Sequence, residues 1–166
     1  MKKYELTNET IEYKGKKLYR IKALIDFGNV EKGARGGFVE KEENLSMSGN
    51  AWVCDNAWVC DNARVCDNAR VCGDANVCGD AFVSDNAQVD KSINYAVIKG
   101  FGTCYRSTTF FRCQDKTVKV SCGCFLGTID EFRNQVKNTR GGKIAKEYLM
   151  IADLMEIHFS EDGYDD

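Results

Sequence analysis

The chain has 166 residues, which is enough for one compact domain or one elongated body with caps, but too few for two globular domains with large cores. Its formal net charge is −2, from 23 basic and 25 acidic residues, and this balance argues against non-specific nucleic-acid binding. The sequence shows neither an apolar stretch long enough to cross a bilayer nor the apolar core of a secretory signal, so we expect a cytoplasmic protein that binds no membrane.

Residues 1–44 alternate apolar and polar side chains in short stretches. The stretches read KYEL, TIEY and KLYRIKAL, and they are separated by Asn8 and Gly15. Such period-two alternation between turn residues is typical of strands. We therefore expect short strands that form an N-terminal β cap and lead into irregular early coils around Val30 and Val39.

A six-residue unit recurs through residues 45–94, and its copies read AWVCDN, AWVCDN, ARVCDN, ARVCGD, ANVCGD, AFVSDN and AQVDKS. Alternation along a strand points Ala and Val inward, and it points the variable second residue and the following Cys or Ser outward. The Asp-Asn and Gly-Asp dipeptides suit sharp corners, because Asn, Asp and Gly tolerate left-handed backbone angles. One hexad cannot bury its inward face alone, so the repeat predicts a stacked parallel β-helix.

This repeat resembles that of left-handed parallel β-helix proteins, in which three hexads make one triangular coil and residues 18 apart stack. The flanks GKKLYRIKALIDFGNVEKGARGGFVEKEENLS, YRSTTFFR and GCFLGTIDEFRNQVKNTRGGKIAKEYLMIADLMEIHF resemble a group of phage and prophage proteins with this architecture. Such proteins are often labelled polymer-forming or hexapeptide-transferase-like. The resemblance covers nearly the whole chain and implies the left hand of the β-helix, but it implies no settled activity.

The segments after the repeat change in character. Residues 95–127 contain YAVIKGF, YRSTTFFRC and TVKVSCGCF, which favour an antiparallel β-meander. Residues 128–160 favour two helices, of which the first begins with a capping box of Thr128 and Glu131 and the second follows a glycine pair. The second helix is apolar well beyond one stripe, so we expect it to contact more than one surface, including another subunit.

These segments together predict a mainly β fold, namely a short left-handed parallel β-helix with an N-terminal β cap and a C-terminal β-meander plus two-helix cap. The chain ends in an acidic tail at residues 161–166. Because each end of a β-helix exposes unpaired backbone groups, both caps are expected to cover the ladder.

The cysteine column of the repeat consists of Cys54, Cys60, Cys66, Cys72 and Cys78. Stacking at 18 residues gives each face at most two thiols, whereas a closed zinc site needs four ligands. Side chains in register point the same way rather than toward each other, so we expect surface thiols in a reducing compartment rather than disulfides.

Four more cysteines lie in or beside the predicted meander: Cys104, Cys113, Cys122 and Cys124. In a strand, the two cysteines of the C-x-C pair would face one side, and the other two thiols could lie nearby across the meander. The sequence is compatible both with a metal site built from these four residues and with a half-buried strand core.

The variable second residue of each hexad gives a further set of candidate binding residues: Trp52, Trp58, Arg64 and Arg70. Stacking places Arg70 one rung from Trp52 and Arg64 one rung from Phe82, and it places Trp58 in one column with Asn76 and Asn94. Exposed Trp and Arg are typical of protein interfaces and of sites for planar ligands. The alternative is a surface ladder in which these side chains only stack on one another.

The stretch YRSTTFFR offers a candidate site for an anionic ligand. Alternation puts Arg106, Thr108, Phe110 and Arg112 on one face of a strand. Guanidinium and hydroxyl donors next to aromatic rings favour a negatively charged, nucleotide-like small molecule. An amphipathic edge strand is the structural alternative.

We therefore expect a non-catalytic binding protein of the phage type that acts in the cytoplasm of a bacterial host cell. It is expected to be a homo-oligomer with no cofactor and no metal. Its expected partner is either a host protein, such as an anti-phage defence protein, or a nucleotide signal that it sequesters.

Three other functions are less favoured. A hexapeptide-repeat acyl- or acetyltransferase usually needs a histidine base near the coil faces, but the single histidine, His158, is predicted at the end of the last helix. A structural polymer would stack its repeats end to end, and the predicted caps oppose this. Ice binding would need a regular threonine ladder, and the outward slots hold Trp, Arg, Asn, Phe, Gln and Cys instead.

Overall fold

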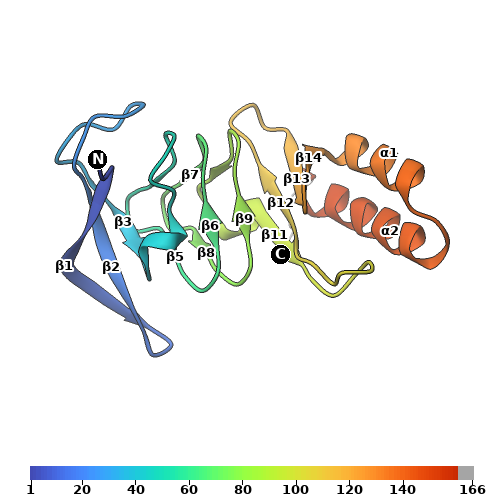
Figure 1. The fold of residues 1–166 in the computed structure, drawn as a ribbon, viewed down its shortest axis with the longest axis horizontal. Coiled ribbons are helices and arrows are strands. Elements are labelled where there is room, and N and C mark those ends of the chain that lie inside the picture. The colour runs from blue at the N-terminus through green and yellow to red at the C-terminus, as the bar shows by residue number, and fades with distance from the viewer. Residues whose placement is uncertain (161–166) are drawn as a thin grey trace.

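The computed structural model describes residues 1–160, and the predicted acidic tail at 161–166 lies outside the described residues. The molecule is elongated, with a stack of short parallel strands in its middle (Figure 1). A β-hairpin covers one end of the stack, and an antiparallel sheet followed by two helices covers the other (Figure 1). The predicted fold class, mainly β with a cap at each end of a short parallel stack, is confirmed over this range.

Seven two-residue strands build the stack, one from each hexad. They are β4 (Trp52–Val53), β5 (Trp58–Val59), β6 (Arg64–Val65), β7 (Arg70–Val71), β8 (Asn76–Val77), β9 (Phe82–Val83) and β10 (Gln88–Val89). Strands three apart pair in parallel, so β4 pairs with β7, β7 with β10, β5 with β8, and β6 with β9. The predicted stacking of residues 18 apart is therefore confirmed.

The interior of the stack is filled by the inward Ala and Val of each hexad. These side chains are all buried, together with Leu45 from the first coil: Ala51, Val53, Ala57, Val59, Ala63, Val65, Ala69, Val71, Ala75, Val77, Ala81, Val83, Ala87 and Val89. Ala has no rotamers to lose and Val has few, so ordering them in a narrow axis costs little conformational entropy. The alternation read from the sequence correctly gives this core.

The corners of the coils repeat one hydrogen-bonding arrangement. Asp55 and Asp61 have positive φ of 55° and 59°, a conformation that Asp tolerates. Their carboxylates accept the backbone N–H groups of Gly73 and Gly79, each 18 residues later, at 3.0 Å. Asp67 makes the same contact one hexad further along. The Asp column is thus a structural ladder that ties successive corners together.

The N-terminal cap is a hairpin of β1 (Tyr4–Tyr13) and β2 (Lys16–Ala23). The sequence predicted a break at Asn8, but β1 continues through it with a bulge between Leu6 and Thr10. β2 pairs antiparallel with β3 (Arg35–Val39), and β3 pairs in parallel with β5. The hairpin and one face of the β-helix therefore form a single five-stranded sheet.

Side chains from the start of the chain satisfy the exposed end of the ladder. The Lys3 ammonium donates to the Ala51 carbonyl oxygen at 2.9 Å and lies over the Phe27 ring. Burial lowers the pKa of Lys3 to about 8. The Tyr4 hydroxyl donates to the Leu45 carbonyl oxygen at 2.9 Å. These bonds cover carbonyl groups of the kind that an open coil end leaves unpaired.

The C-terminal meander is a sheet of β11 (Tyr95–Ile98), β12 (Thr108–Arg112), β13 (Val118–Cys122) and β14 (Phe125–Thr128) in that order. Before it, Ser92–Asn94 form a short 3-10 helix, η2. The prediction that Asn94 continues the column of Asn76 is therefore wrong, because the coil ends in this turn. The backbone N–H of Asn76 instead donates to the Ser92 hydroxyl at 3.1 Å.

The two faces of β12 contact different parts of the molecule. Phe111 packs into the core of the β-helix, and the Thr109 hydroxyl accepts the backbone N–H of Phe82 at 3.0 Å. Phe110, on the other face, packs against the helices. The meander is thus a wall between the β-helix and the helical layer.

The helical layer consists of α1 (Ile129–Thr139) and α2 (Gly142–His158). The predicted capping box is present, since the Thr128 hydroxyl accepts the Glu131 N–H and the Glu131 carboxylate accepts the Thr128 N–H. Phe132 and Tyr148 pack edge to face across the two helices, with ring centroids 5.8 Å apart. In residues 1–160, no helix combines the length and the apolar character needed to span a membrane.

Candidate functional site

Trp52 and Trp58 are not exposed, so the prediction of an exposed tryptophan surface is wrong. Trp52 is 2% exposed and Trp58 is 9% exposed. The N-terminal cap covers both rings, since Tyr4 packs edge-on against Trp52 and Tyr13 packs on Trp58 with centroids 4.3 Å apart. An outward side chain of a β-helix is exposed only where no other element lies over it, and here the hairpin does. These rings anchor the cap to the stack.

Arg64 and Arg70 lie in the predicted register, one rung from Phe82 and Trp52 respectively. The Arg70 guanidinium, however, donates a hydrogen bond to the Asn29 side chain. Arg64 is exposed and lines an open hollow of about 270 Å³ that also contains a carboxylate. Neither arginine therefore lies in an enclosed, uniformly basic site.

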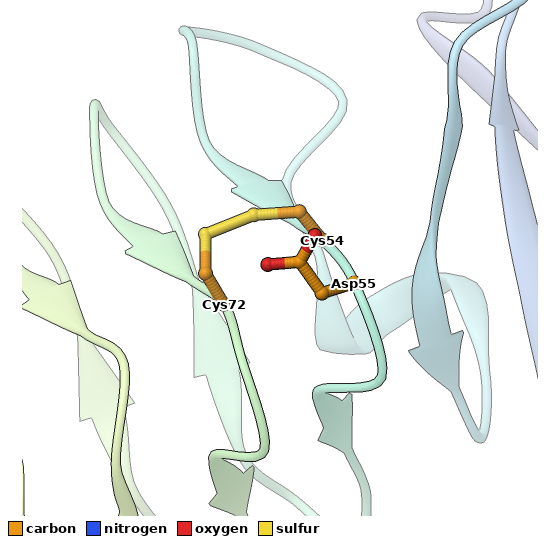
Figure 2. Close-up of side chains that lie close together, drawn as sticks. All are labelled: Cys54, Asp55 and Cys72. Carbon is orange, nitrogen blue, oxygen red and sulfur yellow. A yellow bond between two sulfur atoms is a disulfide. The ribbon is translucent and has the colours of Figure 1, made fainter.

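Cys54 and Cys72 form a disulfide between neighbouring rungs (Figure 2). Their Cα atoms are 4.6 Å apart, which lies within the range that a disulfide spans. The expectation of thiols is therefore wrong for this pair, because in-register side chains one rung apart can reach each other. The other cysteines are free: Cys60, Cys66, Cys78, Cys104, Cys113, Cys122 and Cys124.

Two groups in the repeat place three candidate metal ligands within 4.8 Å of one another: Cys54, Asp55 and Cys72, and Cys60, Asp61 and Cys78. In the first group both sulfur atoms are in the disulfide, beside which the Asp55 carboxylate lies (Figure 2). In both groups the Asp carboxylate accepts a corner N–H. Burial also raises the pKa of Cys60 to about 11, which disfavours the thiolate that a metal needs. We interpret both groups as parts of the corner ladder.

The predicted anion-binding residues of the meander lie on one side of the sheet, the side that faces the helices, but they do not form one binding surface. Arg106 precedes β12 and lines a pocket. Thr108 is buried, and its hydroxyl donates to the Cys122 Sγ at 3.2 Å. The Arg112 guanidinium donates to the Phe159 carbonyl oxygen at 2.7 Å and so holds the end of α2 against the sheet. Thr108 and Arg112 therefore have structural contacts that the sequence pattern does not reveal.

The four cysteines of the meander do not converge on one point. Cys122 and Cys124 were predicted to share a strand face, but Gly123, with φ of 62°, forms the turn between β13 and β14. Both cysteines line the same pocket as Arg106, and Cys104 lies there too. Cys113 is buried on the opposite side of the sheet, in the core of the β-helix.

The pocket lies where the meander meets the two helices, and we call it the junction pocket. It has a volume of about 130 Å³. Its walls come from the loop before β12, the β13–β14 turn, α1 and α2. The polar side chains that line it include Thr103, Cys104, Arg106, Gln135, Thr139 and Arg140.

Two glycines allow the walls of the junction pocket to approach each other. A Cβ atom on Gly123 would lie 2.1 Å from Nη1 of Arg106, so a larger residue here would require this guanidinium to move. A Cβ atom on Gly102 would lie 2.5 Å from the Tyr148 hydroxyl oxygen. Both glycines have positive φ, of 62° and 74°, which also favours glycine. The two glycines therefore permit Arg106 and Tyr148 to lie directly against these two turns.

Cys104 and Arg106 interact directly in the junction pocket. A hydrogen bond from the Arg106 guanidinium holds the pKa of the Cys104 thiol below its usual range, and Thr103 and the charge of Arg140 act in the same direction. The same hydrogen bond raises the pKa of Arg106. On the other wall, burial raises the pKa of Tyr148. The pocket therefore favours negative charge next to Arg106.

The junction pocket carries positive charge that no carboxylate neutralises. Its lining residues include no Asp or Glu. Within the described part of the chain, neither Arg106 nor Arg140 forms an ion pair with a carboxylate. A guanidinium presents a planar fork of donors that matches phosphate and carboxylate groups.

The size of the junction pocket limits what it can hold. Sites for drug-sized ligands measure roughly 300–1,000 Å³. A volume of about 130 Å³ suits one phosphate- or carboxylate-sized group, with the rest of a larger ligand outside. Phe125 and Phe132, whose ring centroids are 5.6 Å apart, supply the apolar part of the lining.

The sequence pattern missed Arg140 as a site residue. Arg140 directly follows α1 and precedes the glycine pair, so its position at a helix end was visible in the sequence, but its approach to the loop before β12 was not. His158 lies outside the pocket lining, and its Nε2 is 3.2 Å from the Ile93 carbonyl oxygen.

Comparisons with known proteins do not assign the chain to a family. No protein-family model matches it, and no curated protein is significantly similar to it. The geometry of the junction pocket is therefore the basis for a functional proposal.

Proposed function

We propose that the protein is a non-catalytic binding protein that captures a small ligand bearing a phosphate group in the junction pocket. The observation that supports this best is the pair of guanidinium groups, Arg106 and Arg140, in a pocket with no carboxylate in its lining. The resemblance to left-handed hexapeptide-repeat proteins of phages favours action in a bacterial cytoplasm and a nucleotide-like signal as the ligand. The β-helix then serves as the rigid body that holds the meander.

The contents of the pocket also favour binding over acyl transfer. An acetyltransferase needs a general base within hydrogen-bond reach of its substrate. The lining residues include neither a histidine nor a carboxylate, the side chains that serve most often as general bases, and the His158 ring contacts the Ile93 carbonyl group instead.

Titration calorimetry at low ionic strength tests the proposal, with inorganic phosphate and adenosine monophosphate as probes. We expect binding at one site, and weaker binding in salt because the contacts are ionic. Arg106→Gln and Arg140→Gln should each weaken binding about tenfold or more, because a hydrogen bond to a charged group contributes about 1.5–3 kcal/mol.

Arg64→Gln is the matched control, because it removes an exposed guanidinium from the β-helix and leaves the junction pocket intact. This variant should bind both probes as the wild-type protein does. The absence of any binding heat for either probe would refute the proposal. An equal loss of affinity in all three variants would show that the effect is one of overall charge.

The outer side of α2 supports a second proposal, which is self-association. Met150, Leu154 and Ile157 are 62%, 55% and 72% exposed and form one stripe at helical spacing. We propose that a second copy of the chain covers this stripe in a two-fold symmetric dimer with antiparallel α2 helices.

Sedimentation equilibrium tests the dimer. The wild-type protein should sediment as a dimer, and Ile157→Glu should sediment as a monomer because it places a charge in the apolar contact. Lys137→Glu, which introduces the same acidic side chain at an exposed position of α1, should leave the dimer intact. A wild-type protein that is monomeric at all concentrations would contradict this arrangement.

A further inference from the structure

The junction pocket contains three thiols that anion capture does not use. Cys104, Cys122 and Cys124 all line it. The Cys122 sulfur accepts the Thr108 hydroxyl beneath the surface, whereas Cys104 and Cys124 are exposed. Small molecules that enter the pocket can therefore reach two sulfur atoms, and these two have different neighbours.

Cys104 is the thiol on which the positively charged groups of the pocket act. Both guanidinium groups line the pocket together with Cys104. They lower the pKa of the Cys104 Sγ, Arg106 most strongly and Arg140 from the end of α1. The Thr103 hydroxyl oxygen lies 3.7 Å from the same sulfur. Thiolates rather than thiols are nucleophilic, and an electropositive, exposed setting of this kind is where reactive cysteines occur.

The thiols of the β-helix provide the contrast within the same chain. Burial raises the pKa values of Cys60 and Cys66 to about 11, so these two remain protonated and shielded. Burial thus disfavours the thiolate at these two repeat positions, whereas one loop thiol shares a pocket with two guanidinium groups.

We propose that Cys104 is a reactive thiol that forms a mixed disulfide with a small anionic disulfide. Glutathione disulfide is an example of this class. Its carboxylates are drawn by Arg106 and Arg140. The Cys104 thiolate attacks one sulfur of the small disulfide, the bond between the two small-molecule sulfurs breaks, and the other half leaves as a thiolate that takes a proton from water. The small disulfide is itself the oxidant, so no other reactant is needed.

Two reagents of opposite character test the proposal on the full chain. Dithiobis(nitrobenzoate) is an anionic disulfide, and dithiodipyridine is a neutral one. With the anionic reagent, one thiol should react about tenfold faster than the others, because electrostatic attraction raises encounter rates by about that factor or more. Peptide mass spectrometry should place this label on Cys104.

Single variants separate the two exposed thiols and the two guanidinium groups. Cys104→Ser should abolish the fast phase, whereas Cys124→Ser, the matched control, should keep it. Arg106→Gln should slow the anionic reagent more than the neutral one. A fast phase that survives in Cys104→Ser, or an equal slowing of both reagents in Arg106→Gln, would overturn the proposal.

The same variants keep this inference separate from anion capture, which uses the same pocket but does not require a thiol. Incubation with glutathione disulfide should add one glutathione to the wild-type protein and none to Cys104→Ser, as seen by intact-mass spectrometry. Phosphate titration of Cys104→Ser then reports on anion capture alone. A negative result for glutathione addition would overturn the reactive thiol but not anion capture. A negative result in the phosphate titration would overturn anion capture but not the reactive thiol.

Discussion

The β-helix and the junction pocket use polar side chains in opposite ways. In the β-helix, the carboxylates of Asp55 and Asp61 accept backbone N–H groups of the next coil, so their hydrogen-bonding capacity is committed to the fold. In the junction pocket, Arg106 and Arg140 have no carboxylate partner among residues 1–160, and the Cys104 thiol is exposed beside them.

This difference follows from what a repeat can build. A side chain that recurs in every hexad meets its own copies or the backbone of the next coil, so its polar groups are satisfied by the repeat itself. Only segments that do not repeat can bring unlike groups, such as a thiol and two guanidinium groups, to one point. We therefore propose that the C-terminal cap contains the binding site and the reactive thiol, and that the stack contributes mainly to the stability of the fold.

The largest expected effect is on the stack. Leu45→Ala should lower the free energy of unfolding by about 2–5 kcal/mol, because it empties a fully buried position in the β-helix core. The folded variant should bind phosphate with unchanged affinity. Urea denaturation and calorimetry measure the two quantities, and a large loss of affinity would break the separation between the two regions.

Arg112→Gln sharpens the comparison inside the C-terminal cap. It should lower the free energy of unfolding by about 1.5–3 kcal/mol, because it removes a charged donor to the Phe159 carbonyl group. Phosphate affinity should not change, in contrast to the effect of Arg106→Gln. If Arg112→Gln instead abolished binding at full stability, the site would have to extend along the helix side of the sheet as far as the end of α2.

Asp55→Ala tests the corner ladder. It should lower the free energy of unfolding by about 1–2 kcal/mol. The left-handed backbone at this corner is unfavourable for Ala, and the Gly73 N–H loses its carboxylate acceptor. Asp55→Asn, which keeps an acceptor and tolerates this backbone, should be close to wild type in thermal denaturation. Equal losses in both variants would mean that the negative charge, and not the hydrogen bond, matters.

The smallest expected effect is an increase in the free energy of unfolding. Ser84 takes the place of cysteine in its hexad, and its hydroxyl is buried without a hydrogen-bond partner among the described residues. Ser84→Ala should raise the free energy of unfolding by about 1 kcal/mol, because it removes an unsatisfied polar group. A destabilised variant in urea denaturation would indicate that the hydroxyl has a partner.

The sequence predicted the β-helix well because its information is local. The Ala and Val of each hexad specify the inward face, and the Asp-Asn and Gly-Asp dipeptides specify the corners. The stacking of residues 18 apart came from the resemblance to left-handed β-helix proteins, and the pairing of strands three apart confirms it. The capping box at Thr128 was likewise readable from four consecutive residues.

The failures concern contacts between segments distant in the sequence. Trp52 and Trp58 are buried by a hairpin that precedes them by tens of residues, and nothing within a hexad signals that cover. Arg112 contacts the end of α2, and Arg140 meets a loop that lies before β12. Periodicity assigns a side chain to a face, but it does not tell which element lies over that face.

The most direct test of the central claim is a titration of the isotopically labelled protein with inorganic phosphate, followed by amide chemical shifts. The two regions lie at separate places along the chain, so the perturbed amides identify the one that binds. We predict shifts in the loop around Arg106, in the turn at Gly123 and at Arg140. Shifts confined to the hexads between Trp52 and Gln88 would contradict the claim that the junction pocket, and not the repeat, binds the anion.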